Sequence, residues 1–236
     1  MKGYQQGSLT DLFCYNIQMS NEQVIQKTKD YVEQKFNHEG TGHDWWHMYR
    51  VWKLAKHIAV SEKNSDMFIV ELGALLHDIA DWKFHDGDME AGPKAARAWL
   101  ESLNVQENII LKIEDIVRNV FFKGANVKQD MKSIEGKIVS DADKLDAIGA
   151  IGIARTFAYG GAHNTLIYNP DIRPVQHQSF EDYKNSKSHT INHFYEKLLL
   201  LKNKLHTKIA RDIAVHRHEF MEQYLDEFYE EWEGKQ

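Results

Sequence analysis

Residues 72–84 read LGALLHDIADWKF, and the fold can be worked out from this stretch. Its apolar residues recur at the spacing of a helix face that is turned toward a protein core: Leu72, Leu75, Leu76 and Ile79. His77 and Asp78 interrupt this apolar run. Burying an ionised carboxylate is costly unless it is paired or coordinates a cation. The adjacent imidazole and carboxylate therefore indicate a cation site on an otherwise apolar helix.

The His-Asp dipeptide is a weak signal by itself, because it also occurs at residues 43–44 and 85–86. Its surroundings separate the three copies. Residues 85–86 lie in the polar, turn-like stretch FHDGD, and residues 43–44 follow EGTG, a loop that leads into a helix. Only the pair at residues 77–78 ends a strongly apolar run, and this pair is the candidate for the central motif.

The composition is that of an ordinary soluble globular protein. The chain has 236 residues, of which 42% are hydrophobic and 27% charged, and its net charge is −6. This charge provides no general attraction to nucleic acid or to an anionic membrane. The single cysteine, Cys14, fits a reducing compartment. With neither a signal-peptide pattern nor a long apolar run in the sequence, we expect a cytoplasmic location.

The chain divides into a short leader and a single domain. Residues 1–18 lack helical periodicity and are expected to form a flexible extension, and residues 19–236 form the domain. The domain begins with Ser20 and Gln23 at the spacing of a capping box, which predicts the start of a helix.

Almost every later segment also repeats at helical period, and no sustained alternation predicts a strand. We therefore expect an all-α fold. The further helices are expected near residues 46–58, 68–79, 89–103, 106–121 and 134–159, with two more within 180–233. The connector at residues 160–179 contains two prolines and has little periodicity, so it is either a lid or binding loop or a plain surface excursion.

A metal site needs more ligands than one His-Asp pair, and two other segments offer them. Upstream, HDWWHMYRV places His47 on a predicted helix. Downstream, IVSDADKLDAIGAIGIARTF contains three aspartates among small and apolar residues: Asp141, Asp143 and Asp146. In order, the candidate pattern is His47, then His77 and Asp78, then Asp143. Two imidazoles and two carboxylates suit one divalent ion of Mn, Fe, Co, Ni or Zn and, less well, Mg.

These three segments, in this order, resemble the HD-domain metal-dependent phosphohydrolases. The motifs HxxRV (residues 47–51), LLHDIADWKF and DADKLDAIGAIGIARTF are similar to those of the small bacterial single-domain branch of YedJ or YpgQ type, and the resemblance extends over about residues 20–235. It implies a single all-α HD domain with C-terminal helices and a metal held between core helices. It also implies that the ligands are His47, His77, Asp78 and Asp143.

The resemblance implies a reaction as well. The YpgQ-like branch implies hydrolysis of nucleoside or deoxynucleoside triphosphates to the monophosphate and pyrophosphate, with a metal-activated water as the nucleophile. Other branches imply a 5′-nucleotidase or a phosphodiesterase, and a catalytically silent, nucleotide-binding sensor domain is a non-enzymatic alternative. Dinuclear relatives have additional histidines between the His-Asp pair and the last aspartate. Here that interval holds only His85, so one metal is expected, with Mn favoured.

Residues beside the predicted ligands are candidates for other roles. Asp81, four residues after His77, is a candidate general base or supporting carboxylate. Lys144 is a candidate for catalysis and phosphate binding. Three further cations are candidates for phosphate binding: Arg50, Lys83 and Lys123. The alternative for Arg50 and Lys144 is an ion pair with Asp81 or Asp146, and Asp146 could hydrogen-bond a ligating histidine or only pair locally.

Overall fold

The structure, a computed structural model, describes residues 19–37, 44–80, 88–121, 131–175 and 188–235. Within these ranges every regular element is a helix, so the predicted all-α fold is confirmed. The helices are α1 (Asn21–Phe36), α2 (Trp45–Ser61), α3 (Met67–Leu76), α4 (Ala91–Ser102), α5 (Glu107–Asn119), α6 (Ile134–Asp146), α7 (Gly149–Ala162), α9 (Thr190–Glu196), the 3₁₀ helix η2 (Leu198–Lys204) and α10 (Lys208–Trp232). None of the described helices is long and apolar enough to cross a membrane.

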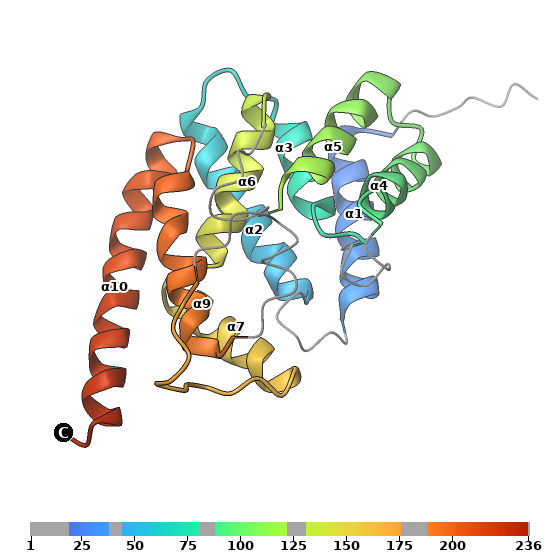
Figure 1. Cartoon of the computed structure of the whole chain (residues 1–236). Helices are drawn as coiled ribbons and strands as arrows, with labels where there is room; N and C mark the ends of the chain where they lie inside the picture. Colours follow the sequence, from blue (N-terminus) through green and yellow to red (C-terminus); the bar gives the residue numbers. More distant parts are fainter. Residues whose placement is uncertain (1–18, 38–43, 81–87, 122–130, 176–187, 236) are drawn as a thin grey trace, which may run out of the picture.

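The helices form two groups around a central trio (Figure 1). In the middle, α2, α3 and α6 pack against one another. On one side α1 and α5 pack on α3 and α4 packs on α5, and on the other side α10 runs along α7 and η2. The trio therefore joins the two halves of the molecule, and side chains at its ends can come from several helices.

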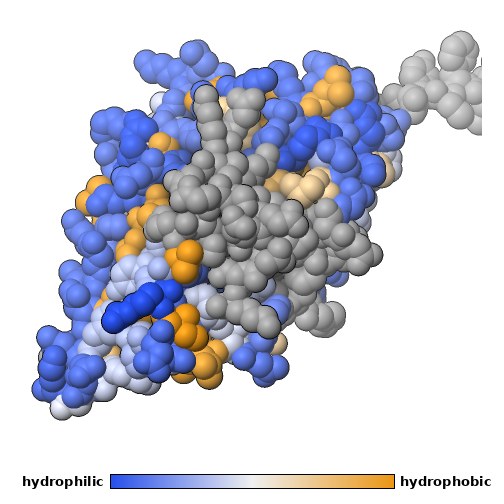
Figure 2. Space-filling model, viewed as in Figure 1, coloured by the Kyte–Doolittle hydropathy of each residue, from blue (hydrophilic) through white to orange (hydrophobic). Residues whose placement is uncertain are grey.

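The core is centred on α3, in which all residues from Phe68 to Leu76 are buried. A helix that is apolar on every side must be enclosed by other elements, and here α1, α2, α5 and α6 supply the cover. Polar residues predominate on the described part of the face in Figure 2. The apolar residues are thus gathered inside, and a rigid helix leads directly to the His-Asp pair.

The starts of α1 and α2 follow from their capping residues. At α1 the predicted capping box is confirmed, because the Ser20 amide donates to the Gln23 side chain and the Gln23 amide donates to the Ser20 hydroxyl. At α2 the Asp44 carboxylate accepts a hydrogen bond from the His47 amide at 2.9 Å. Asp44, the second residue of the His-Asp dipeptide at residues 43–44, therefore caps the helix that carries His47.

The prediction of one helix over residues 134–159 was wrong. Helix α6 ends at Asp146, and α7 begins at Gly149 after a break at Ala147 and Ile148. Gly149 has a φ of +78°, a left-handed conformation in which glycine is much less strained than other residues. The apolar periodicity continues across the break because both helices face the core, so it did not reveal the turn.

The His-Asp pair also lies differently from its prediction. Helix α3 ends at Leu76, and residues 77–80 form a turn, so the pair follows the helix and is not part of it. The connector predicted at residues 160–179 is shorter than expected at its start, because α7 continues to Ala162. Residues 163–175 have no helix, and residues 176–179 lie outside the described part of the chain.

The predicted C-terminal helices are present, with one difference. Helices α9 and α10 lie within the predicted range, but the 3₁₀ helix η2 separates them and begins two residues after α9 ends. Thr207 caps α10 by accepting a hydrogen bond from the Ala210 amide. The 25 residues of α10 then extend along one side of the molecule (Figure 1).

We expect that Gly149→Ala lowers the free energy of unfolding by about 1–2 kcal/mol, because a side chain disfavours the left-handed conformation. The added Cβ would also lie 3.0 Å from Cγ of Arg217. Chemical denaturation measures the change. Gly161→Ala, near the end of the same helix and with no atom within 4 Å of the added Cβ, is the matched control and should leave the stability unchanged or slightly raised. Equal stability of the two variants would contradict the proposed role of Gly149.

Candidate metal centre

Two histidines from different elements meet at the end of the central trio. The Nε2 atoms of His47, in the first turn of α2, and His77, just after α3, are 3.1 Å apart. Both side chains are completely buried. The centroids of the two rings are 5.1 Å apart and the rings are nearly perpendicular, so each presents the edge that carries Nε2.

The other nitrogen of each ring fixes its tautomer. Nδ1 of His77 is 2.8 Å from the carbonyl oxygen of Ala74, which can only accept a hydrogen bond, so this nitrogen carries a proton. Nδ1 of His47 is 2.8 Å from the Asp146 carboxylate. In the neutral form of each ring, the remaining Nε2 presents a lone pair. Two lone pairs at this distance repel one another unless a positive charge lies between them.

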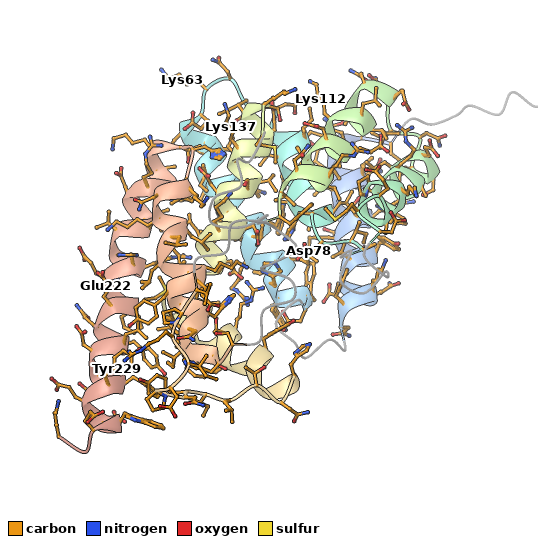
Figure 3. The ribbon with its side chains drawn as sticks, in the orientation of Figure 1. Lys63, Asp78, Lys112, Lys137, Glu222 and Tyr229 are labelled. Atoms are coloured by element: carbon orange, nitrogen blue, oxygen red, sulfur yellow. The ribbon has the colours of Figure 1, made fainter. Side chains whose placement is uncertain are left out.

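Two carboxylates complete the cluster. An oxygen of Asp78 lies 3.5 Å from Nε2 of His47 and 3.6 Å from Nε2 of His77. An oxygen of Asp143, on the last turn of α6, lies 3.7 and 3.8 Å from the same two nitrogens. Figure 3 shows Asp78 in the middle of the molecule, away from the lysines at one end. Three of the four residues that the sequence proposed as metal ligands, His47, His77 and Asp78, thus have ligand atoms that all lie within 4.8 Å of one another, and Asp143 lies near the two histidine nitrogens at the edge of this group.

The spacing of these atoms fits a divalent transition-metal ion. Ligand atoms about 2.0–2.2 Å from an ion lie about 3 to 3.5 Å from one another in octahedral or tetrahedral geometry. The distances here run from 3.1 Å between the two nitrogens to 3.8 Å between His77 and Asp143. Two carboxylates balance the charge of a divalent ion, and two imidazoles favour transition metals over calcium. His47, His77, Asp78 and Asp143 could therefore hold one such ion.

Asp146 contacts Nδ1 of His47, the ring nitrogen that does not face the other predicted ligands. Its buried carboxylate accepts hydrogen bonds from His47 and also from two arginines, Arg50 on α2 and Arg155 on α7. Burial would raise the pKa of Asp146, but the hydrogen bonds from His47 and Arg50 and the charge of Arg155 hold it far below its usual range. An ionised carboxylate here keeps the proton on Nδ1 of His47 and leaves Nε2 directed at the other ligands.

The pKa of His47 is subject to opposing influences. Burial and the charge of Arg155 lower it, but the hydrogen bonds with Asp146 and Asp78 outweigh them and raise the pKa above its ordinary value. The cluster thus stabilises positive charge at His47. A metal cation at the same place satisfies the same carboxylates, so proton and metal compete for one position.

The structure places Arg50 and Lys144 in local pairs. Nε and Nη2 of Arg50 donate to the two oxygens of Asp146 at 2.7 and 3.1 Å, which is the ion-pair alternative that the sequence left open. Nζ of Lys144 donates to the hydroxyl and the carbonyl of Ser140 on its own helix. Burial lowers the pKa of Lys144 to about 8. Whether either residue binds substrate remains a prediction.

Three other candidates, Asp81, Lys83 and Lys123, lie outside the described residues. Arg155, in contrast, was missed by sequence reasoning. It is the only cation in the small, apolar run GAIGIARTF, and that contrast is the signal by which it could have been noticed. In a continuous helix, Asp146 and Arg155 would lie about 13 Å apart along the axis and on opposite faces. The break at residues 147–148 brings them into contact.

Asp141 is structural, although it lies only two residues before Asp143. Its carboxylate is completely buried and accepts hydrogen bonds from the amides of His206 and Thr207 and from the Thr207 hydroxyl, at 2.7 to 3.0 Å. These residues immediately precede α10. Asp141 therefore fastens the start of α10 to α6, while Asp143 faces the histidines.

Comparison with known proteins agrees with this geometry. The family model "HD domain" matches residues 45–148, which include both histidines and all the aspartates of the cluster. The chain is 36% identical over 208 residues to YpgQ of Bacillus subtilis, which covers 88% of this chain and 93% of that protein. The chain therefore belongs to the HD-domain family, and it is a metal-dependent hydrolase of the HD superfamily.

Several solved structures are similar to this chain in both fold and sequence. A protein of Lactobacillus plantarum superposes with a TM-score of 0.81 at 34% identity, covering 92% of this chain and 100% of that one. An HD-superfamily hydrolase of Bacillus thuringiensis gives 0.68 at 40% identity, covering 91% and 99%. YpgQ of B. subtilis in complex with ADP gives 0.70 at 32% identity, covering 90% and 97%. The likeness thus extends over nearly the whole length of each protein.

We expect that Asp78→Ala abolishes stoichiometric binding of Mn²⁺ and reduces hydrolytic turnover to background, because the cluster loses one of its two charge-balancing ligands. Metal content after loading and dialysis measures the first effect, and circular dichroism checks that the helices survive. Asp212→Ala, which removes a carboxylate paired with Lys208 on the surface of α10, is the control. Full activity of the Asp78 variant would refute the site.

We also expect Asp141→Asn and Asp143→Asn to separate stability from metal binding. Asp141→Asn should lower the free energy of unfolding by about 2–4 kcal/mol, since hydrogen bonds to a buried charge contribute about 1.5–3 kcal/mol each, but should leave Mn²⁺ stoichiometry intact. Asp143→Asn should abolish Mn²⁺ binding. Because the side chain of Asp143 is 27% exposed, the free energy of unfolding of the metal-free variant should be unchanged. Denaturation and metal titration of both variants provide the comparison, and loss of metal in the Asp141 variant at unchanged stability would contradict the assignment.

Proposed function

We propose that the chain hydrolyses nucleoside or deoxynucleoside triphosphates to the monophosphate and pyrophosphate. In this reaction the oxygen of water forms a bond to the α-phosphorus. The bond from that phosphorus to the oxygen bridging to the β-phosphorus breaks, and pyrophosphate leaves with the electron pair. The reaction needs a site that holds a polyanion, makes water nucleophilic and accepts its proton.

The observation that carries this proposal is the group formed by the two Nε2 atoms and the Asp78 carboxylate, with the Asp143 carboxylate within 4 Å of both nitrogens. When bound there, a divalent cation supplies a Lewis acid for phosphoryl oxygens and lowers the pKa of water toward neutral. We propose one ion and favour Mn among Mn, Ni, Co, Fe, Zn and Mg, because the mixed nitrogen and oxygen ligand set suits a transition metal.

The residues of the chain orient this site before substrate arrives. Asp146 and the Ala74 carbonyl hold the two Nδ1 protons, so neither imidazole can turn without breaking a buried hydrogen bond. Because His47 and His77 are buried at the ends of packed elements, little reorganisation is needed during the reaction. Folding thus preorganises these groups, and preorganised charges and dipoles are the usual source of electrostatic catalysis.

Protein charges beyond the ligands favour a phosphate chain. Arg50 lies beside the cluster with 31% of its side chain exposed, so it can approach a phosphate oxygen while it remains bound to Asp146. Lys83 and Lys123 are proposed as additional phosphate contacts, and Asp81 is proposed as the base that receives the proton of the attacking water. Lys144 could take part only after its bonds to Ser140 are released.

The nucleotide part of the proposal is supported by likeness alone. YpgQ, to which this chain is 36% identical over 208 residues, has been crystallised with ADP. A phosphomonoesterase acting as a 5′-nucleotidase, or a phosphodiesterase, would use the same ligands and differ in the products. A nucleotide-binding sensor would bind without turnover.

Product analysis tests the proposal. Metal-stripped protein is reloaded with Mn²⁺, Co²⁺, Ni²⁺ or Mg²⁺ and incubated with a panel of ribo- and deoxyribonucleoside triphosphates, and the products are resolved by anion-exchange chromatography. We expect monophosphate and pyrophosphate in equal amounts, with the highest rate in Mn²⁺. Release of inorganic phosphate or intact triphosphates under every metal would overturn the proposal, and the Asp78→Ala variant controls for contaminating phosphatases.

A further inference from the structure

Arg155 is a cation that the proposed metal site does not yet use. It lies on α7, and its side chain is 17% exposed. Its Nη1 donates to Oδ2 of Asp146 at 2.8 Å, and the same oxygen accepts the hydrogen bond of His47 at 2.8 Å. Arg155 is therefore separated from a predicted metal ligand by one carboxylate oxygen.

The two arginines on Asp146 are held in different ways. Arg50 directs both Nε and Nη2 at the carboxylate, so one edge of its guanidinium is occupied. Arg155 donates to this carboxylate through Nη1, and its buried Nε has no hydrogen-bond partner among the residues that the structure describes. A buried N–H group without an acceptor is unfavourable, and such groups in native proteins call for an explanation. Arg155 is thus fixed at one nitrogen with donor capacity left over.

The charges point the same way. Asp146 is one negative charge against two guanidinium groups, and the charge of Arg217 also reaches it. Asp78 and Asp143 would be balanced by a divalent ion. Among the described residues, positive charge is therefore in excess at this side of the cluster. Because buried or half-buried charges are costly without partners, an anion that binds here would supply the missing partner.

We propose that Arg155 binds phosphate oxygens of the substrate directly, and this inference rests on the proposed function for the identity of that substrate. Asp146 holds one nitrogen, and the free donors of the guanidinium contact the phosphate chain of a molecule bound at the metal. Arginine suits this role, because its fork of donors matches phosphate geometry. Arg155 is in this view a substrate-binding residue, whereas Arg50 chiefly anchors Asp146.

The experiment compares three variants of the full chain loaded with Mn²⁺: Arg155→Met, Arg155→Lys and the control Arg217→Met. Arg217 also contributes a positive charge near Asp146, but it donates to the carbonyl of Leu145, which needs no anion. Binding of inorganic phosphate is followed by the broadening of its ³¹P signal by the bound Mn²⁺. The affinity for Mn²⁺ is measured separately, and thermal unfolding checks each fold.

We expect Arg155→Met to weaken phosphate binding at least about tenfold, the loss of one charge-assisted contact, while Mn²⁺ affinity changes less than about threefold. Arg155→Lys should recover part of the loss, and Arg217→Met should weaken phosphate binding less than Arg155→Met does, because it removes a nearby positive charge but no donor to the phosphate. If Arg155→Met does not fold, Arg155→Lys tests the proposal instead, and we expect it to bind phosphate more weakly than the unaltered protein at unchanged Mn²⁺ affinity.

Three outcomes would overturn the inference: unchanged phosphate affinity in the Arg155 variants, an equal loss of Mn²⁺ affinity, or no phosphate binding by the unaltered protein. An equal loss of metal would mean that Arg155 acts only through Asp146 and His47. Phosphate binding does not require hydrolysis of a nucleotide. If phosphate binding depends on Arg155 but no triphosphate is cleaved, the proposed reaction fails and the role of Arg155 stands.

Discussion

The buried carboxylate of Asp146 is the interaction on which this architecture depends. It binds His47 and Arg50 from α2 and Arg155 from α7, while it belongs to α6 itself. Three helices are thereby fixed relative to one another at the place where the predicted metal ligands meet. A buried charge tolerates little misplacement of its partners, since an unpaired ion in the interior is unfavourable by several kcal/mol. The same constraint that holds the helices together therefore also sets the tautomer of His47.

The ends of helices set the positions of His77 and Arg155. Helix α3 ends at Leu76, and the carbonyl of Ala74 in its last turn accepts the Nδ1 proton of His77. The break between α6 and α7 likewise lets Arg155 return to Asp146, nine residues earlier in the chain. The end of α3 and the break between α6 and α7 thus place His77 beside the other predicted ligands and Arg155 beside Asp146.

Neighbouring aspartates on α6 illustrate how position decides role. Asp141 faces the start of α10, Asp143 faces the two histidines, and Asp146 lies behind His47. Residues two positions apart on a helix point to different sides, whereas residues three apart share a face one turn further on. Asp141 therefore reaches the start of α10, while Asp143 and Asp146 both approach His47, one at each ring nitrogen. The short motif DADKLD thereby combines a structural anchor, a predicted ligand and a supporting carboxylate.

The all-α class, the capping box at Ser20 and the residues of the metal cluster could be predicted from the sequence, because each depends on local spacing or on side chains that are costly to bury without a partner. The break at residues 147–148 could not, since the apolar periodicity continues across it, and the left-handed conformation of Gly149 and the packing of α7 against α10 become visible only in the tertiary structure. Arg155 was missed for a related reason. In a continuous helix its partner Asp146 would lie on the opposite face. Only the tertiary structure decides which charges, distant in the sequence, bind the same carboxylate.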